Sequence, residues 1–208
     1  MIRHDKIDAG SFTLPFRYCA ALSRDKIASV CKSNQLGVYN IHDGSFNQND
    51  ITSLFDDIKT VGEKCVKSIT TDPIRGHIIV GTSRNTGLLF IFDEKLNFVR
   101  ALKLPEVIEG PDEILFHEGL LLICDKDKRC AYAVTMDTSK TEAELLYELP
   151  KPDIDGLTWI PRSICADRAG FVYILWYGYG NYIIAQYSQD GQQLLTTKRT
   201  KNEAEAGL

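Results

Sequence analysis

Hydrophobic and polar positions alternate over short distances along this chain. Short runs rich in Val, Ile, Leu, Tyr and Phe, such as "HIIVG" (77–81) and "LLFIF" (88–92), are separated by Gly, Asp, Asn and Ser. This pattern is typical of β-strands joined by tight turns. No segment carries a long apolar stripe at the helical period; the segment 49–65 comes closest and is compatible with one short helix or a loop.

The chain also repeats itself. Three segments end alike, "FTLP" (12–15), "LKLP" (102–105) and "YELP" (147–150), and their prolines lie 90 and then 45 residues apart. These distances indicate a unit of roughly 45 residues, with one degraded copy of the marker near "SLFDD" (53–57).

Each unit contains the same order of short strands. The first runs are 18–22, 65–71, 113–117 and 163–166; the second are 26–32, 77–81, 120–124 and 171–175; the third are 37–41, 88–92, 131–135 and 182–187; and the fourth, clear in three units, are 99–104, 144–149 and 193–197. Repeated units of four short strands predict an all-β fold, a β-propeller of four-stranded antiparallel blades. A β-sandwich is the competing interpretation, but it leaves the repeat of the "LP" marker unexplained.

The predicted domain organisation follows the repeat. We expect one propeller over residues 1–199, with blades at 12–60, 61–106, 107–155 and 156–199, and a flexible polar tail at 200–208. The segment "SFTLP" (11–15) is typical of the last strand of a further blade. Two interpretations stay open: a segment of a larger propeller, and a closed ring of four blades.

The last unit, "ICADRAGFVYILWYGYGNYIIAQYSQDGQQLL" (164–195), resembles an NHL repeat. The residues that fall on the positions of that pattern are Asp167, Gly170, Tyr173, Gly180, Asn181, Asp190 and Gly191. A looser copy at 69–96 has Asp72, Gly76 and Asn85 in place. The sequence departs from the pattern in having Ile183 where the family often has arginine, in lacking the acidic residue near Leu175 and Trp176, and in showing four units where the family usually has six.

The resemblance implies a particular biological setting. NHL propellers form the C-terminal regions of tripartite-motif ubiquitin ligases, where they bind protein or RNA while a separate RING domain recruits the ubiquitin machinery. It therefore implies a non-catalytic protein-recognition module, the substrate-binding or scaffold part of such a ligase. Any ligase activity would reside in a RING domain outside this chain.

Composition and charge limit the partners and the cellular location that we expect for this protein. The net charge is -4, which gives nucleic acid no general attraction, so we expect no DNA partner and only a local basic patch for RNA. No apolar run is long enough to span a membrane, and the N-terminus has no apolar signal core. The six cysteines are scattered without metal-ligand spacing, which predicts reduced, mostly buried thiols and a cytoplasmic protein.

In a propeller, the loops joining second to third strands gather on one face with the connections between blades. On this chain that face would carry Arg84, Lys126, Lys128, Arg129, Trp176, Tyr177 and Tyr179. Cations beside exposed aromatic rings suit an acidic or aromatic peptide, and equally a single-stranded RNA. Net charge favours protein, so RNA is the alternative partner. The small residues Gly178, Gly180 and Asn181 are expected to form a hinge, which leaves the tyrosines as the contact residues.

The sequence contains little that indicates a catalytic site. The histidines 4, 42, 77 and 117 fall in different units without a consistent nucleophile, and the usual hydrolase and phosphate-binding motifs do not occur. A calcium-dependent propeller hydrolase would need inward carboxylates, for which Asp72, Asp112, Glu113 and Asp167 could converge. Because Asp72 and Asp167 match turn positions of the repeat, a structural role is favoured. We expect no catalytic residue, cofactor or metal.

Overall fold

The computed structural model describes residues 16–31, 34–55, 65–82, 86–137 and 140–200. Within these ranges the chain forms sixteen strands in four antiparallel sheets, with order β1-β2-β3-β4, β5-β6-β7-β8, β9-β10-β11-β12 and β13-β14-β15-β16. The predicted all-β propeller architecture is confirmed. The β-sandwich is wrong, because each sheet is a four-stranded meander of its own.

The strands are short and follow the repeat. They are β1 (Phe16–Ala21), β2 (Lys26–Cys31), β3 (Gln35–Asn40) and β4 (Phe46–Asp50) in the first sheet; β5 (Val66–Asp72), β6 (His77–Thr82), β7 (Leu88–Phe92) and β8 (Phe98–Lys103) in the second; β9 (Glu113–His117), β10 (Leu120–Asp125), β11 (Cys130–Thr135) and β12 (Leu145–Glu148) in the third; and β13 (Ile160–Ala166), β14 (Val172–Gly178), β15 (Asn181–Tyr187) and β16 (Leu194–Thr200) in the fourth. A 3-10 helix, η2 (Thr52–Phe55), follows the first sheet. The proposed extra strand at 11–15 and the tail from residue 201 lie outside the described residues.

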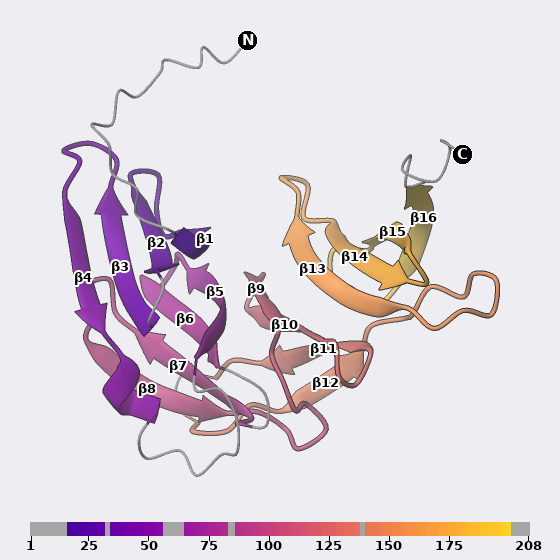
Figure 1. The fold of residues 1–208 in the computed structure, drawn as a ribbon, viewed down its shortest axis with the longest axis horizontal. Coiled ribbons are helices and arrows are strands. Elements are labelled where there is room, and N and C mark those ends of the chain that lie inside the picture. The colour runs from indigo at the N-terminus through magenta and orange to yellow at the C-terminus, as the bar shows by residue number, and fades with distance from the viewer. Residues whose placement is uncertain (1–15, 32–33, 56–64, 83–85, 138–139, 201–208) are drawn as a thin grey trace.

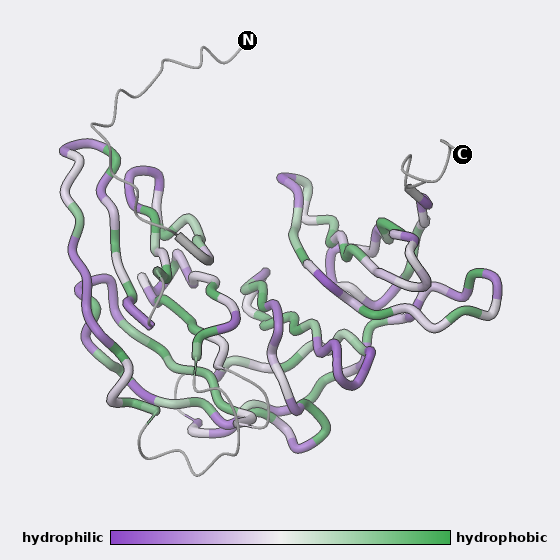
Figure 2. The backbone as a smooth tube through the Cα atoms, viewed as in Figure 1, coloured by the Kyte–Doolittle hydropathy of each residue, from purple (hydrophilic) through white to green (hydrophobic). Residues whose placement is uncertain are grey.

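The four sheets follow one another along an open arc (Figure 1). Strands β1, β5, β9 and β13 line the inner side of the arc, and the first and fourth sheets stand on either side of its opening. The described part of the chain therefore does not close into a ring of four blades. The outermost strand β4, "FNQND", is hydrophilic, whereas β6 and β7 are among the hydrophobic stretches (Figure 2).

Three apolar cores hold the arc together, one at each junction between neighbouring sheets. The first joins residues such as Val30 and Leu36 to Phe90 and Phe92 of the second sheet. The second core packs Ile91 and its neighbours on Leu121 and Val134. In the third core, Ala131 and Ala133 of the third sheet pack with Trp159, just before β13, and with large side chains of the fourth sheet: Ile174, Trp176, Ile183 and Tyr187. Successive side chains of a strand point to opposite sides of the sheet. One side of an inner sheet therefore packs against the preceding sheet, and the other side packs against the following sheet.

Candidate functional site

The turns joining second to third strands lie against the connections between sheets. The amide of Leu104, just after β8, donates to the carbonyl of Gly87 in the β6–β7 turn at 2.6 Å. On the same face, the hydroxyl of Ser68 in β5 donates to the carbonyl of Pro111 at 3.1 Å. Lys128, in the β10–β11 turn, pairs with Glu109 of the β8–β9 connection. These turns and connections lie on one face of the arc, which we call the turn face.

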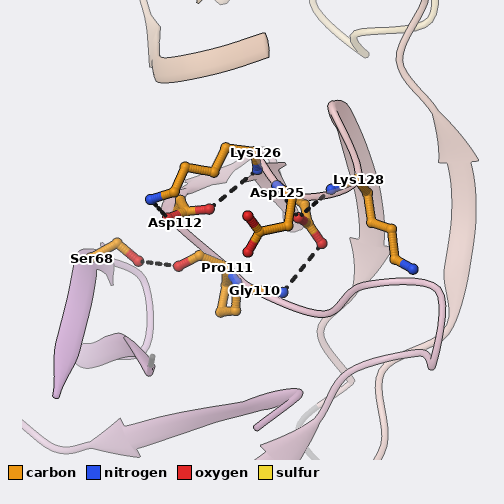
Figure 3. A network of polar contacts seen from close by, with 8 residues as sticks. Ser68, Gly110, Pro111, Asp112, Asp125, Lys126 and Lys128 are labelled. Atoms are coloured by element: carbon orange, nitrogen blue, oxygen red, sulfur yellow. Dashed lines mark hydrogen bonds and ion pairs between the residues drawn. The ribbon is translucent and has the colours of Figure 1, made fainter. Parts of the chain in front are cut away.

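A fully buried carboxylate organises the centre of this face (Figure 3). One oxygen of Asp125 accepts hydrogen bonds from the amides of Glu109 and Gly110 at 2.8 and 3.2 Å. The other accepts from the amides of Asp127 and Lys128, each at 3.0 Å. Backbone donors satisfy a buried charge of this kind, so Asp125 fastens the β10–β11 turn to the β8–β9 connection.

Two of the predicted cations are paired internally. The ammonium group of Lys126 contacts the Asp112 carboxylate, and Nζ of Lys128 lies 2.6 Å from the Glu109 carboxylate. The hydrogen bond with Glu109 raises the pKa of Lys128 above its ordinary value. Lys126 and Lys128 thus neutralise acids on the connection before β9, and they offer less charge to a ligand than the sequence suggested. Arg84 lies outside the described residues.

Trp176 is not on the turn face, contrary to the prediction. The strand β14 continues to Gly178, so the alternation of buried and half-buried residues also continues and directs Trp176 into the core, with no exposed surface. Its indole nitrogen donates to the hydroxyl of Tyr187 at 3.0 Å. The sequence interpretation placed the turn at 176–181, whereas β14 and β15 leave only Tyr179 and Gly180 between them.

This two-residue turn presents a tyrosine to solvent. Tyr179 and Gly180 both have positive φ, 49° and 79°, which is the geometry of the tightest hairpins and which glycine adopts without strain. The Tyr179 side chain is 73% exposed. With Arg129 of the neighbouring β10–β11 turn and with Tyr177, it lines a hollow of about 170 Å³. The predicted neighbourhood of Arg129 and the two tyrosines is thus present in the structure.

A second arginine, which the sequence did not single out, lies over the ring of Tyr177. The guanidinium carbon of Arg162 lies 5.2 Å from the centre of the Tyr177 ring, and that ring lies 5.1 Å from the ring of Tyr182. An irregularity in the pairing of β13 with β14, between Pro161 and Ser163, brings Arg162 to this position. No sequence signal marks such a bulge. We call Arg129, Arg162, Tyr177 and Tyr179 the arginine–tyrosine corner.

Neither arginine of the corner has an anionic partner among the residues that the structure describes. This separates Arg129 and Arg162 from Lys126 and Lys128, which are paired. An unpaired guanidinium beside an exposed aromatic ring suits a ligand that brings an anionic group and an apolar surface together.

The aspartate of the NHL-like spacing in the last unit caps a turn. In the fourth sheet, one carboxylate oxygen of Asp167 accepts from the amides of Ala169 and Phe171 at 2.9 and 3.0 Å, and the other accepts from the hydroxyl of Tyr173 at 3.0 Å. Gly170 in the same turn has a φ of 87°. These residues carry part of the NHL-like spacing, and their contacts explain it as turn chemistry.

The equivalent aspartate of the second sheet is buried. Asp72 accepts from the amides of Ile74 and Arg75 at 3.0 and 3.2 Å, and the Arg75 guanidinium pairs with it at 2.7 Å. The turn that follows Asp72 lies beside the far end of β9, whereas Glu113 begins β9 at the opposite end. The four carboxylates considered for calcium therefore do not converge.

A different acidic cluster does occur on the turn face. Carboxylate oxygens of Asp112, Asp125 and Asp127 lie within 4.8 Å of one another. Lys126 pairs with Asp112, and backbone amides occupy both oxygens of Asp125. Lys126 therefore offsets one of the three negative charges, and the backbone amides hold the Asp125 carboxylate in place.

Glu113, the first residue of β9, is a half-buried carboxyl group on the inner side of the arc. It lines a cavity of about 390 Å³ together with residues of β1, β5 and β13, including Cys19, Thr70 and Ile164. Burial, and secondarily the negative charge of Asp112, raise the pKa of Glu113 to about 7, although Lys126 opposes the shift. The carboxyl group is thus partly protonated at neutral pH.

No helix within the described ranges is long and apolar enough to cross a membrane.

Comparisons with known proteins identify the fold but no family. The sequence matches no family model and no curated protein. Among solved structures, it is similar to a protein of unknown function from Bacteroides caccae, at 12% identity and a TM-score of 0.59, covering 90% of this chain and 61% of that one. It is also similar to the β-propeller domain of Cps50 (Swd1) from Myceliophteria thermophila, at 13% identity and a TM-score of 0.57, covering 85% and 57%.

A third similar structure is the WD40 β-propeller domain of Doa1, at 11% identity and a TM-score of 0.54, covering 91% of this chain and 70% of that one. At these identities the likeness concerns the fold alone, and the fold is a β-propeller. The chain spans 61% and 57% of the first two structures.

Proposed function

We propose that this chain is a non-catalytic recognition module that binds a protein partner through the arginine–tyrosine corner of its turn face. The observation that carries the proposal is the hollow of about 170 Å³ that Arg129 lines with the 73% exposed Tyr179 and with Tyr177. The Arg162 guanidinium lies over the Tyr177 ring. Tyrosine and arginine are the side chains that most often dominate protein interfaces, because they combine large contact area with directed hydrogen bonds. The fitting ligand is an acidic segment that also carries an apolar residue.

The distribution of charge favours protein over RNA at this face. RNA affinity depends on several unpaired cations along a groove, because each neutralised phosphate releases counterions. Here Lys126 and Lys128 are paired with acids, and the net charge of the chain is -4. Two arginines and two tyrosines are enough to contact one acidic peptide. They are few for a groove that follows an RNA strand, which needs a longer row of cations and aromatic rings.

We further propose that the module is the substrate-binding or scaffold part of a tripartite-motif-like ubiquitin ligase. The support is the NHL-like spacing of the last unit, whose Asp167, Gly170 and Gly180 form the turns that such a repeat requires. Ubiquitin transfer itself would be carried out by a RING domain elsewhere. Co-expression of the chain fused to a RING domain with a selected peptide-bearing substrate would test this role by substrate ubiquitination.

Selection of peptides from a random displayed library tests the binding function. We expect acidic sequences to be enriched on the wild-type chain. Affinity should fall roughly ten-fold or more for Tyr179→Ala and for Arg129→Ala, as for residues at the centre of an interface. Arg168→Ala is the matched control, since Arg168 is exposed in the β13–β14 turn at the opposite end of the fourth sheet.

Two results would contradict the proposal. One is a peptide set that binds the wild type and both corner variants equally well. The other is submicromolar, sequence-selective binding of single-stranded RNA at physiological salt, which would establish the RNA alternative instead.

A further inference from the structure

The hollow beside Arg129 is small, and two neighbouring sheets form its walls. Within the described ranges it is lined by Arg129, Thr158, Ile160, Tyr177, Gly178 and Tyr179. This lining contains one cation, apolar and aromatic groups, and no acid. The volume of the hollow is about 170 Å³. Because a cavity of about 150 Å³ holds a group the size of benzene, the hollow has room for one side chain of ordinary size.

Backbone contacts hold the walls of the hollow in place. A Cβ atom added at Gly178 would lie 2.8 Å from the carbonyl oxygen of Thr158 and 2.9 Å from Cε3 of Trp159, so the end of β14 lies directly against the segment before β13. The side-chain amide of Asn181 donates to the carbonyl of Tyr179 at 3.1 Å, which holds the two-residue turn. Widening the hollow for a second side chain would therefore require these backbone segments to move.

The position of Arg129 limits how far apart the two groups of a ligand can lie. Arg129 lines the hollow itself, so an anionic group that pairs with it must be close to the apolar group that fills the hollow. In an extended peptide, neighbouring side chains point to opposite sides, and two side chains on the same side are about 7 Å apart. At a C-terminus, the α-carboxylate carbon and the Cβ atom are bonded to the same Cα and lie about 2.5 Å apart. A C-terminal residue therefore fits the hollow better than an internal acid with an apolar neighbour.

The charges of the surrounding segments leave Arg129 available for one carboxylate. Lys128, in the same turn, pairs with Glu109 at 2.6 Å. In the segment before β13, Asp155 pairs with Arg199 at 3.0 Å. Arg129 has no anionic partner in the part of the chain that the structure describes. Its planar guanidinium can bind a carboxylate with two parallel hydrogen bonds.

We propose that the ligand of the arginine–tyrosine corner is the C-terminus of a partner protein, ending in an aliphatic residue such as leucine or valine. The α-carboxylate pairs with Arg129, the last side chain enters the hollow against Ile160, and the ring of Tyr179 covers the preceding residue. A tryptophan side chain is too large for this space. Capture of a terminal carboxylate is a recurring mode of peptide recognition. This assignment rests on the proposed function and identifies the anionic group of its ligand.

A library of random peptides displayed with free C-termini tests this assignment. We expect aliphatic residues to be enriched at the last position on the wild-type chain. A selected peptide is then synthesised with a free C-terminal carboxylate and as the C-terminal amide, and fluorescence anisotropy measures both affinities. Amidation should weaken binding roughly ten-fold or more, because it removes the charge from a charge-assisted hydrogen-bonded pair.

Two variants show whether Arg129 recognises the carboxylate. Arg129→Gln should abolish the difference in affinity between the acid and the amide, because the group that distinguishes them is gone. Lys128→Gln is the matched control, since it removes the same charge from the same turn. Lys128 is paired with Glu109, so the difference between acid and amide should remain. Far-ultraviolet circular dichroism confirms that each variant is folded.

The outcomes separate this assignment from the proposed function. If selection shows no preferred last residue, or if acid and amide bind equally well while both depend on Arg129 and Tyr179, the assignment is wrong and the proposed function stands. If amidation still weakens binding to Arg129→Gln, another group binds the carboxylate and the assignment is also wrong. If no peptide is enriched, or if the selected peptides depend on neither Arg129 nor Tyr179, the proposed function fails as well.

Discussion

The indole Nε1 of Trp176 donates a hydrogen bond to the hydroxyl of Tyr187 at 3.0 Å, deep in the core between the third and fourth sheets. The same hydroxyl donates to the carbonyl oxygen of Pro150 at 2.9 Å. Pro150 ends the "YELP" marker that revealed the repeat. The marker therefore lies where the chain passes from one sheet to the next, and its backbone is fastened to the centre of the following sheet.

Replacing Tyr187 by Phe should destabilise the protein although the ring is kept. The buried indole N–H of Trp176 and the carbonyl of Pro150 would both lose their partner, which costs about 1–3 kcal/mol for each buried group left unsatisfied. Urea unfolding followed by tryptophan fluorescence measures the change. Tyr39→Phe, at a half-buried position of the first sheet, should change the free energy of unfolding by less than about 0.5 kcal/mol; equal effects of the two variants would contradict this explanation.

Asp125 should be the most sensitive aspartate of the turn face. Asp125→Ala leaves four backbone amides without their acceptor, and we expect a loss of about 3 kcal/mol or more in the free energy of unfolding. Asp125→Asn keeps one acceptor oxygen and should be intermediate. Asp153→Ala, at an exposed position in the connection before β13, is the control. If Asp125→Ala and Asp153→Ala unfold at the same urea concentration, the fastening role is wrong.

Glu113 should make stability depend on pH. Its pKa is about 7 in the folded protein and 4.5 ordinarily, so between these values the folded state binds more protons than the unfolded chain. This contribution is fully present below about pH 4.5 and is lost as the pH rises through about 7. Glu113→Gln should therefore be more stable than the wild type at alkaline pH, and the two should converge toward acidic pH.

Urea unfolding at several pH values measures this difference. Ile74→Ala, at a turn residue that is 86% exposed, should retain the wild-type pH dependence. If the wild type and Glu113→Gln run parallel across the whole range, Glu113 does not have the raised pKa.

Thiol labelling should separate the six cysteines into two classes. Cys31, Cys65, Cys124 and Cys130 are buried, whereas Cys19 and Cys165 are exposed. Burial, and secondarily Asp167, raise the pKa of Cys165, which slows its reaction because the thiolate is the reactive form. We expect iodoacetamide to modify Cys19 and Cys165 in the native protein and all six after unfolding, as read by mass spectrometry. Native labelling of Cys124 would contradict the packing of the third core.

The sequence pattern located strands where both sides of a sheet are covered. The runs 88–92 and 113–117 coincide with β7 and β9. The strand β4, "FNQND", was missed because four of its five residues are polar and exposed, so hydrogen bonding to β3 rather than side-chain burial defines it. Trp176 was misplaced because the glycines suggested a longer turn than the two residues that the hairpin uses.

The sequence predicted only part of the candidate site. Arg129 and the two tyrosines could be grouped from loop positions, since propeller topology alone brings those turns together. The acids that pair with Lys126 and Lys128 belong to another connection, and the bulge that positions Arg162 depends on local backbone geometry. Neither can be read from residue spacing.

The three separate junction cores have a consequence for how the molecule opens. Each core couples only two neighbouring sheets, so structural fluctuations pass along the arc from neighbour to neighbour. The second and third sheets pack against a neighbouring sheet on both sides, whereas within the described ranges the first and fourth sheets pack against a neighbouring sheet on one side. Amide hydrogen exchange should therefore be slowest in β6 and β10 and faster toward the two ends of the arc.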